Sequence, residues 1–336
     1  MKTKSIIFTE PCRAELIEEE LSSPKEHEVI VKLAVSSISS GTERANLVGD
    51  KNVSITANSV PFPRISGYSS AGEIIEKGAS VKDLNVGDRV ALSWSTHSEY
   101  VCINEKNVHK ILDSSVSYNE AALWHISTFP AAAIRKCRLE FGESAAVMGM
   151  GILGLIAVKL LRCAGAAPVI AVDPISKRRQ KALEAGADYA LNPASEDFKN
   201  RLQQLTNGGA DIAVEVTGNG AALDMLLDGM AKFGRVALLG CTRNSDFTIN
   251  YYRKVHAPGI SLIGAHTQAR PELESSPGLW TTRDDVAAVQ KLFSLKRLEL
   301  QSLVDEIHPP CDAPTVYTRL AEEKDFPITQ FDWRKI

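Results

Sequence analysis

The sequence predicts a two-domain α/β protein in which a barrel-like β domain is joined to a doubly wound parallel sheet. The chain has 336 residues, which exceeds the usual size of one domain, about 100–200 residues, so two domains are expected. Short β-type runs separated by turn residues occupy residues 1–115. From about residue 119, helical segments alternate with apolar strands. That alternation is typical of a parallel sheet covered by helices.

The β domain is predicted from short runs with turn residues between them. The runs cover residues 29–35, 72–78 and 88–92, and Gly87 and Asp88 provide a turn just before the last run. Short strands at this spacing favour a compact barrel.

The second domain is predicted from helical segments at 119–139, 152–165 and 176–186, and from strands at 145–149, 168–173, 188–191, 211–216 and 234–239. After about residue 267 the pattern becomes mixed, and residues 282–295 have the spacing of an amphipathic helix. We therefore assign 119–266 to the parallel-sheet domain. Residues 267–336 are expected to fold back onto the β domain formed by 1–118.

A glycine-rich turn joins the first predicted strand of the second domain to its helix. Gly149, Gly151 and Gly154 form a GxGxxG pattern, and Ile152 and Leu153 open the helix. The first glycine permits the tight turn, the second lets the backbone approach phosphates, and the third lets the helix pack on its strand. Amides and the helix dipole at such a helix N-terminus bind a pyrophosphate. The pattern predicts a dinucleotide site, and a glycine-rich turn without a ligand is the alternative.

Asp173 favours NAD over NADP as the dinucleotide. It ends the strand that follows the helix, nineteen residues past Gly154. An acid at this place accepts hydrogen bonds from the ribose hydroxyls and would repel a 2′-phosphate. Ser176, Lys177 and Arg179 could hold a 2′-phosphate, so NADP is kept as the less favoured alternative.

Thr217 and Gly240 each come just after a predicted strand. Ligands of doubly wound sheets bind beyond the carboxyl ends of the strands, so both residues are expected near the nicotinamide. Ordinary strand-to-loop turn chemistry is the alternative.

Composition indicates a cytoplasmic protein that acts on a small molecule. The formal net charge of −3 gives no support for a nucleic-acid surface or a polybasic membrane patch. No run approaches the roughly 18 apolar residues of a membrane span, and the N-terminus lacks the apolar stretch of a signal peptide. The cysteines lie far apart without a CxxC pair, so we expect free, mostly buried thiols and no cysteine-built zinc site. They are Cys12, Cys102, Cys137, Cys163, Cys241 and Cys311.

Several ordered motifs carry a resemblance over nearly the whole chain. They are GYSSAG at 67–72, VGDRV at 86–90, SEYV at 98–101, the glycine turn, AGAD at 185–188 and VTG at 216–218. In this order they resemble the medium-chain dehydrogenase/reductase superfamily, which contains the zinc alcohol and polyol dehydrogenases. The resemblance implies a GroES-like β-barrel catalytic domain and a Rossmann dinucleotide-binding domain. It also places Arg178 at the ribose contact and implies a homodimer or homotetramer, with 259–264 as a candidate edge strand.

The departures from that superfamily lie at its metal ligands. Where the zinc members carry Cys-Gly-Thr/Ser-Asp this chain has SGTE at 40–43, and where they carry Gly-His-Glu it has GYS at 67–69. Their third ligand falls near His125, and the four-cysteine lobe that follows Gly-Asp-Arg-Val is missing. Zinc takes about four thiolate, imidazole or carboxylate ligands. The resemblance therefore implies a zinc-free enzyme, with an unusual site built on His125 and Glu43 as the alternative.

Residues 39–44 (SSGTER) and 67–72 narrow the resemblance to zinc-free branches of the superfamily. These are similar to threonine- or polyol-dehydrogenase-like proteins, bacteriochlorophyllide dehydrogenase-like proteins and the bi-domain oxidoreductases of sugar biosynthesis. The second domain of the last group is missing here.

Without a metal, side chains must manage the proton released as hydride leaves for the nicotinamide, and such acid–base help is worth roughly 10²–10⁴-fold. The resemblance places Thr42, Glu43, Tyr68 and His125 around the nicotinamide. His125 is the first choice for acid or base, because its unperturbed pKa is about 6.5. Tyr68 could donate to a substrate oxygen, Thr42 matches the relay hydroxyl, and Glu43 could orient a partner or bind substrate hydroxyls.

Each of these four residues has a structural alternative. His125 could cap a helix or bridge the domains, and Tyr68 could fill the volume of the lost metal. Thr42 could make an ordinary turn hydrogen bond, and Glu43 could form a salt bridge with Arg44 or another cation. His97 and His266 are weaker candidates for the same cleft.

The favoured function is an NAD-dependent, zinc-independent oxidoreductase that interconverts a secondary alcohol and a ketone on a polyol, sugar or cyclitol-like substrate. Polar residues at the positions of the metal ligands suit a hydroxyl-rich substrate. The alternatives are a zinc-free NADPH ene or quinone reductase, a redox-neutral epimerase or lyase with tightly bound NAD, and a non-catalytic nucleotide-binding regulator.

Overall fold

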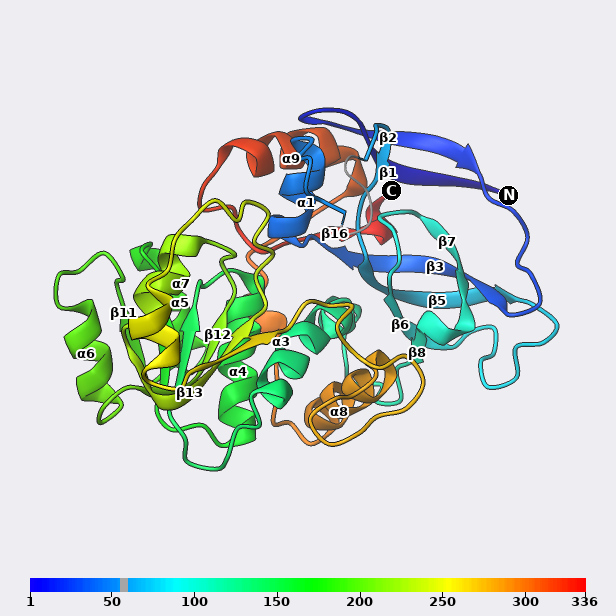
Figure 1. Cartoon of the computed structure of the whole chain (residues 1–336). Helices are drawn as coiled ribbons and strands as arrows, with labels where there is room; N and C mark the ends of the chain where they lie inside the picture. The colour runs from blue at the N-terminus through cyan, green and yellow to red at the C-terminus, as the bar shows by residue number, and fades with distance from the viewer. Residues whose placement is uncertain (55–59) are drawn as a thin grey trace. The chain divides into compact units, whose positions relative to one another are not determined.

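The computed structural model describes residues 1–54 and 60–336, and the chain divides into two compact units (Figure 1). Unit 1 consists of Met1–Ile126 and Val289–Ile336, and unit 2 of Ser127–Ala288. Each unit contains its own sheet system.

Unit 1 is built on two sheets. The smaller has the order β2 (Arg13–Glu20), β1 (Lys2–Glu10) and β4 (Arg64–Ile65). The larger has the order β15 (Glu306–His308), β16 (Thr329–Asp332), β3 (Glu28–Ser37), β5 (Ser69–Lys77), β6 (Arg89–Ser93) and β8 (Val108–Lys110), with β7 (Tyr100–Asn104) paired to β3. β16 runs antiparallel to β3, so residues near the C-terminus complete a sheet that the N-terminal part begins.

The three α-helices that lie wholly among the described residues of unit 1 are α1 (Ser40–Leu47), α2 (Tyr118–Ala121) and α9 (Ala313–Glu322). α1 contacts both β1 and α9. The hydrophobic core beneath them includes four fully buried aromatic side chains, those of Phe8, Tyr317, Phe331 and Trp333.

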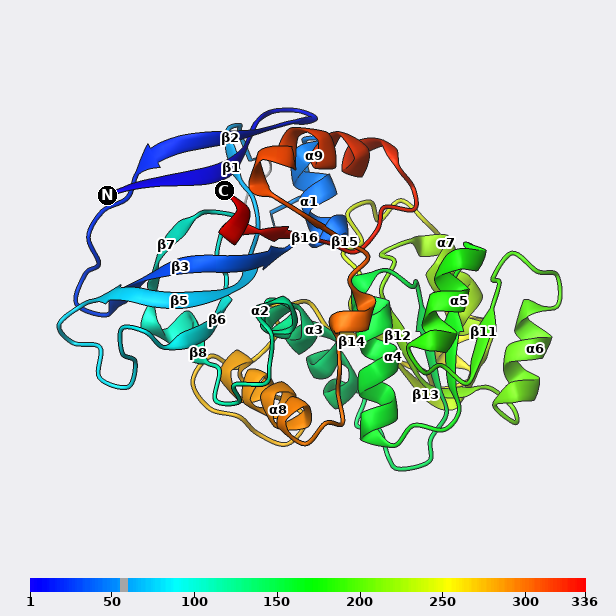
Figure 2. The same ribbon diagram turned by 180° about the vertical axis from the view of Figure 1, so that it is seen from behind.

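Unit 2 is a six-stranded parallel sheet in the order β11 (Tyr189–Leu191), β10 (Val169–Val172), β9 (Ala145–Met148), β12 (Ala210–Glu215), β13 (Met230–Leu238) and β14 (Ser261–Gly264). Figure 2 shows helices on both sides of it. They include α4 (Ile152–Ala164), α5 (Ser176–Glu184), α6 (Phe198–Leu205) and α7 (Gly220–Leu227). The strand order reverses between β9 and β12, and such a reversal marks the ligand side of a doubly wound sheet. The predicted fold class is confirmed.

The boundaries between the units differ from those expected after 118 and 266. Residues up to 126 stay in unit 1 because α2 packs on β3, β5 and β6. Residues 267–288 stay in unit 2, where buried Asp285 accepts a hydrogen bond from Arg135 at 3.0 Å and lies 3.5 Å from Arg270. The chain passes between the units within two helices, α3 (Trp124–Lys136) and α8 (Thr282–Ser294).

The single helix expected at 119–139 is in fact two helices, α2 and α3. The hydroxyl of Ser69 donates a hydrogen bond of 2.7 Å to the carbonyl of Ala122, between the two. That carbonyl is thus paired with β5, and the side-chain bond competes with a continuous helical ladder.

All six cysteines are outside disulfides, as expected, but the expectation that most are buried is wrong. Only Cys137 is buried, whereas Cys12, Cys241 and Cys311 are exposed. Two of the exposed ones lie outside helices and strands, Cys12 between β1 and β2 and Cys241 after β13, and Cys311 lies in a short 3-10 helix, Pro310–Asp312, just before α9.

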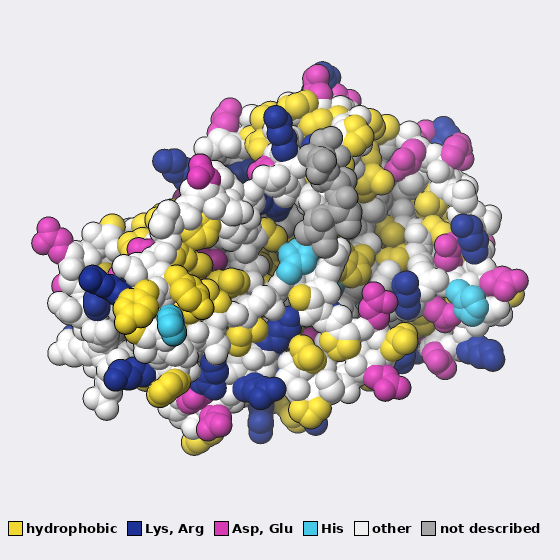
Figure 3. Space-filling view, in the orientation of Figure 1, with side chains coloured by type: hydrophobic (Ala, Val, Ile, Leu, Met, Phe, Trp, Pro, Cys, Tyr) yellow, Lys and Arg dark blue, Asp and Glu magenta, His cyan; other side chains and the backbone are white. Residues whose placement is uncertain are grey.

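None of the helices in the described part of the chain is long and apolar enough to cross a membrane. Acidic and basic side chains both occur on the face shown in Figure 3.

Candidate active site and cofactor site

The glycine turn of unit 2 has the geometry that its three glycines predict. Gly149 has a φ of +100°, and a Cβ there would lie 2.7 Å from Cγ2 of Thr217. A Cβ at Gly154 would lie 1.8 Å from the carbonyl oxygen of Gly149. Both positions therefore require glycine for reasons internal to the fold.

Gly151 differs from the other two glycines. It is the N-cap residue of α4 with extended backbone angles, φ −77° and ψ −169°, and a Cβ there would meet nothing within 4 Å. No side chain caps α4, and its first turn, which Ile152 and Leu153 begin, contains no acid. The first amides of a helix have no partner within the helix. Open space in front of these amides fits a pyrophosphate.

Asp173 lies directly beside this turn. Its carboxylate accepts hydrogen bonds of 2.8 Å from the backbone amides of Met150 and Ile175, and the residue is only 3% exposed. Each carboxylate oxygen has a second lone pair, so both can still accept a ribose hydroxyl. Arg178 lies 4.0 Å from this carboxylate. Arg179 instead donates to the carbonyls of Asp173 and Pro174, so its guanidinium supports the turn into α5.

Thr217 and Gly240 lie at the carboxyl ends of β12 and β13, as expected. The amide and hydroxyl of Thr217 both donate to Glu215, as does the amide of Gly218 at 3.1 Å. A Cβ at Gly240 would lie 2.2 Å from the amide nitrogen of Gly218. The two loops therefore pack against each other, and glycine is needed at this approach.

Glu215 was missed by the sequence interpretation. It is 2% exposed, and burial raises the pKa of its carboxyl although three hydrogen bonds from the next loop favour the charged form. An acid that ends an apolar run, AVE at 213–215, is the signal that could have found it.

In unit 1, Tyr68 and His125 are brought together with Trp94. The ring centroids of Tyr68 and His125 lie 5.8 Å apart at 87°, and those of Trp94 and His125 lie 4.7 Å apart at 68°. Edge-to-face contacts of this kind between aromatic rings are favourable. His125 is 1% exposed, and the hydroxyl of Tyr68 donates to that of Ser39. The predicted pair of acid–base candidates therefore forms one cluster.

Trp94 is a second residue that the sequence interpretation missed. It is 44% exposed and has a φ of +59°, a left-handed conformation that is unusual for a bulky side chain. Backbone strain of this kind persists only where the surroundings impose it and often marks a functional site. No local pattern predicts it, because left-handed positions normally carry glycine or asparagine.

Glu43 points into the interior of unit 1. It is 2% exposed, and it accepts hydrogen bonds from the amide of Ser39 at 2.8 Å and from the hydroxyl of Tyr317 at 2.5 Å. Nε2 of His97 lies 3.1 Å from the same carboxylate. Arg44 donates a hydrogen bond to the carbonyl of Glu323, and His97 is a basic side chain in contact with Glu43.

The remaining candidates lie elsewhere. Thr42 is half-buried on α1, and its carbonyl accepts a hydrogen bond of 3.0 Å from Asn46. His97 is fully buried beside Glu43. In unit 2, His266 follows β14, and burial together with Arg243 and Lys136 lowers its pKa.

The two residues considered as zinc ligands, Glu43 and His125, have other contacts here. Within residues 1–54 and 60–336, no group of three His, Cys, Asp or Glu side chains is placed to hold a metal. The two candidate ligands also differ in surroundings, since Glu43 is bound by three donors and His125 is enclosed by aromatic rings. A zinc site made of Glu43 and His125 would have to break these contacts.

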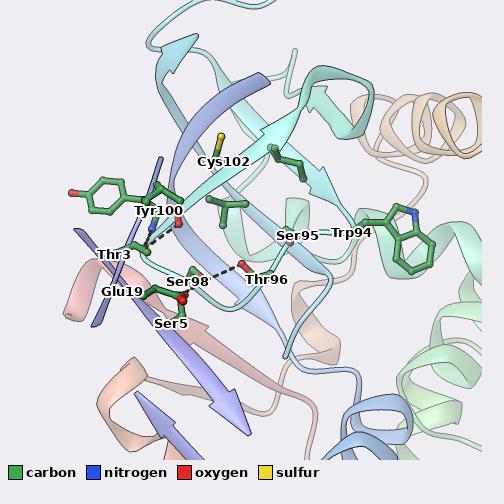
Figure 4. A pocket seen from close by; sticks show the side chains of 12 residues that line it. Thr3, Ser5, Glu19, Trp94, Ser95, Thr96, Ser98, Tyr100 and Cys102 are labelled. Atoms are coloured by element: carbon green, nitrogen blue, oxygen red, sulfur yellow. Dashed lines mark hydrogen bonds between the residues drawn. The ribbon is translucent and has the colours of Figure 1, made fainter. Parts of the chain in front are cut away.

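A pocket of about 170 Å³ lies next to β7 in unit 1 (Figure 4). Hydroxyl groups line much of it, and Ser98 forms hydrogen bonds of 2.8 Å with both Ser5 and Thr96. Trp94 lines it as well, whereas none of Thr42, Glu43, Tyr68 and His125 does. The pocket is therefore separate from the acid–base cluster except through Trp94.

Comparisons with known proteins show the family. Residues 25–124 match the alcohol dehydrogenase GroES-like domain, and residues 153–276 match the zinc-binding dehydrogenase family. The D-guloside 3-dehydrogenase of Escherichia coli K12 is 28% identical over 260 residues, which cover 76% of this chain and 73% of the relative. The L-threonine 3-dehydrogenase of Pyrococcus abyssi is 30% identical over 276 residues, which cover 71% and 76%. The chain is a nicotinamide-dependent oxidoreductase and belongs to the medium-chain dehydrogenase/reductase superfamily.

Solved structures show the same fold. The 2R,3R-butanediol dehydrogenase of Bacillus subtilis has a TM-score of 0.81 at 23% identity, covering 98% of this chain and 99% of that one. A short chain alcohol dehydrogenase of E. coli CFT073 complexed with NADH has a TM-score of 0.82 at 19% identity, with coverage of 98% and 99%. A Sinorhizobium meliloti 1021 protein bound to NADP has a TM-score of 0.81 at 18% identity, with coverage of 99% and 99%.

Proposed function

We propose that this protein is an NAD-dependent, zinc-independent dehydrogenase that interconverts a secondary alcohol and a ketone on a polyol, sugar or cyclitol-like substrate. The observation that carries the proposal is the cluster of Tyr68 and His125, two acid–base groups in ring contact at positions where zinc relatives have metal ligands. Relatives whose names include guloside, threonine and sorbitol dehydrogenase support a substrate with several polar groups.

NAD is favoured over NADP by the surroundings of Asp173. A 2′-phosphate would meet a buried carboxylate, and Arg179 is already bonded to backbone carbonyls. Structural neighbours have been solved with NADH and with NADP, so the fold accommodates either, and the choice depends on residues at this position. Asp173 would bind the ribose, and the amides after Gly151 would bind the pyrophosphate.

The side chains of unit 1 then handle the proton. NAD, when bound, supplies the hydride acceptor. His125 accepts the proton of the substrate hydroxyl as the carbon–hydrogen bond breaks, because a neutral imidazole has a ring nitrogen that can accept a proton. Tyr68 stabilises the developing oxygen charge. Its hydrogen bond with Ser39 joins two hydroxyls, so when Ser39 donates to Tyr68, the hydrogen of Tyr68 can be given to the substrate oxygen.

We also propose that the chain assembles as a homodimer or homotetramer. β14 is the last strand of the parallel sheet and exposes part of Leu262. Unpaired strand edges are ready templates for pairing with another chain. Light scattering of the purified protein measures this directly, and a monomer at all concentrations would contradict it.

A substrate panel tests the proposed reaction. Cyclic and acyclic polyols, sugars and simple secondary alcohols are offered with NAD or NADP while absorbance of the reduced nicotinamide is followed. We expect reduction of NAD with at least one polyhydroxylated substrate. Quinone or enone reduction with NADPH and no alcohol oxidation would contradict the proposal. NAD that stays bound through gel filtration, without net NADH formation on any alcohol, would favour redox-neutral chemistry instead.

A further inference from the structure

The hydroxyl of Ser39 does not cap the helix that begins after it. Ser39 is the N-cap residue of α1, and an N-cap serine ordinarily accepts a hydrogen bond from an amide two or three residues further on. Ser39 makes no such bond. It is 4% exposed, and its hydroxyl shares a hydrogen bond with the hydroxyl of Tyr68 instead. The side-chain oxygen that could cap this helix is therefore hydrogen-bonded to a tyrosine that lies just before β5.

Glu43 fixes Ser39 from the interior. Its Oε1 accepts the amide of Ser39 at 2.8 Å, and its Oε2 accepts the hydroxyl of Tyr317 at 2.5 Å. Nε2 of His97 lies 3.1 Å from Oε2. A buried carboxylate is tolerable only when its oxygens are hydrogen-bonded. Three donors from three segments hold this one in a single orientation, and Ser39 with it.

The directions of the hydrogen bonds around His97 and Glu43 follow from Trp333, which can only donate. Nε1 of Trp333 can only donate, and it donates to the oxygen of Ser36 at 2.8 Å. The hydrogen of Ser36 is then available for Nδ1 of His97, 2.6 Å away. With Nδ1 as the acceptor, the proton of a neutral His97 lies on Nε2 and points at Glu43. Each donor in this series, from Trp333 through Ser36 and His97, therefore faces an acceptor.

His97 also touches the backbone that presents Tyr68. Gly67 has a φ of +85°, and a Cβ there would lie 2.7 Å from both Cδ2 and the amide nitrogen of His97. That amide donates to the carbonyl of Ser66 at 3.0 Å. The cluster thus reaches Tyr68 along two routes, through the hydroxyl of Ser39 and through the chain at 66–67.

We propose that Glu43, His97 and Tyr317 form a positioning cluster that fixes the direction of the Tyr68 hydroxyl through Ser39. The inference rests on the proposed function in one respect, namely that Tyr68 donates to a substrate oxygen. Ser39 and Glu43 are positioning residues, since they act through Tyr68. The cluster gives a role to the burial of Glu43 and to its three hydrogen-bond contacts, those with Ser39, His97 and Tyr317.

A spectroscopic experiment tests the positioning without any substrate. The chain contains seven tyrosines, so protein labelled with ¹³C at tyrosine Cζ gives few signals, and Tyr68→Phe assigns one to Tyr68. We expect Ser39→Ala to shift that signal and Ser39→Thr to restore it. Glu43→Gln is expected to shift it too, because Glu43 holds Ser39, which is hydrogen-bonded to Tyr68. If Glu43→Gln fails to fold, Tyr317→Phe removes one donor to Glu43 while keeping the ring, and a smaller shift is expected.

Ser5→Ala is the matched control. Ser5 is also a buried serine of unit 1, 2% exposed, and it donates to Ser98 at 2.8 Å. We expect this variant to leave the Tyr68 signal in place. A Tyr68 signal that is unmoved by Ser39→Ala and by the Glu43 or Tyr317 variant would overturn the positioning role.

A kinetic measurement separates this inference from the proposed function. With an alcohol substrate, Ser39→Ala should lower kcat by about tenfold or more, with a smaller effect on KM, and Ser39→Thr should recover kcat. If wild-type protein oxidises no alcohol but the Tyr68 signal responds as described, the proposed function fails and the positioning cluster stands. If alcohol oxidation is found and Ser39→Ala changes neither kcat nor the signal, the positioning cluster fails alone.

Discussion

Replacing Gly151 by alanine should separate ligand binding from folding in unit 2. The backbone angles at this residue, φ −77° and ψ −169°, suit any L-amino acid, and a Cβ would meet nothing within 4 Å. A compatible Gly→Ala change stabilises by about 0.4–1 kcal/mol through the unfolded chain. Glycine is preferred over alanine at an N-cap, which offsets this gain, so the variant should unfold close to the wild-type Tm. The added methyl group fills the space in front of the helix amides that we assign to a pyrophosphate.

The expected loss of affinity follows from the hydrogen bonds displaced. One or two bonds from backbone amides to a charged group, each worth about 1.5–3 kcal/mol, correspond to NADH binding that is weaker by roughly 10- to 100-fold or more. Nicotinamide fluorescence in a titration measures this without a substrate, and a thermal melt measures stability on the same samples. Unchanged NADH affinity in a folded Gly151→Ala protein would refute the assignment.

Two other glycines provide matched comparisons. Gly142 lies at the amino end of β9 with a φ of +87° and open space around it, so Gly142→Ala should lower stability by about 1–2 kcal/mol and leave NADH affinity unchanged. Gly154→Ala should be much more damaging, because its Cβ would lie 1.8 Å from a backbone oxygen. The pattern of effects, more than any single value, distinguishes a ligand site from a tight turn.

Further predictions concern other residues of both units. Asp173→Asn should weaken NAD binding by about tenfold through loss of a charged acceptor, without weakening NADP binding. Asp188→Asn is the control and should leave NAD binding unchanged. Asp188 likewise accepts a hydrogen bond from a backbone amide, that of Val169 at 2.8 Å. His125→Asn should lower kcat by roughly 10²–10⁴-fold with NADH affinity unchanged, and full turnover would remove the acid–base role. Burial raises the pKa of Glu215 above its ordinary value of 4.5, so the folded state holds this proton more tightly than the unfolded state. Wild-type stability should fall as pH rises from about 4.5 through the raised pKa of Glu215, whereas Glu215→Gln should lack that fall. Thermal melts of both proteins across this pH range would show it as a difference between their Tm values that changes with pH.

The parallel sheet of unit 2 was predictable because its strands are buried on both faces. All four residues of β9 are buried, and such strands appear in sequence as continuous apolar runs. The cofactor turn was equally local, since its three glycines and the first turn of α4 span six residues. Local rules of backbone conformation and helix geometry were sufficient there.

The cluster in unit 1 was not predictable in this way. Glu43 meets Tyr317, 274 residues away, and His97, 54 residues away. A single sequence contains no periodicity that relates such positions. The resemblance to the superfamily drew attention to Glu43 and His125, but it could not show that Glu43 points inward, or that the hydroxyls of Ser39 and Tyr68 are hydrogen-bonded.

The most direct measurement of the central claim combines metal analysis with turnover. Purified protein is treated with a chelator until it contains less than about 0.1 zinc per chain, and oxidation of the best alcohol from the panel is then followed with NAD. The account predicts that kcat is the same before and after zinc removal and is not raised by added zinc. Activity that disappears with the metal and returns with stoichiometric zinc would contradict it.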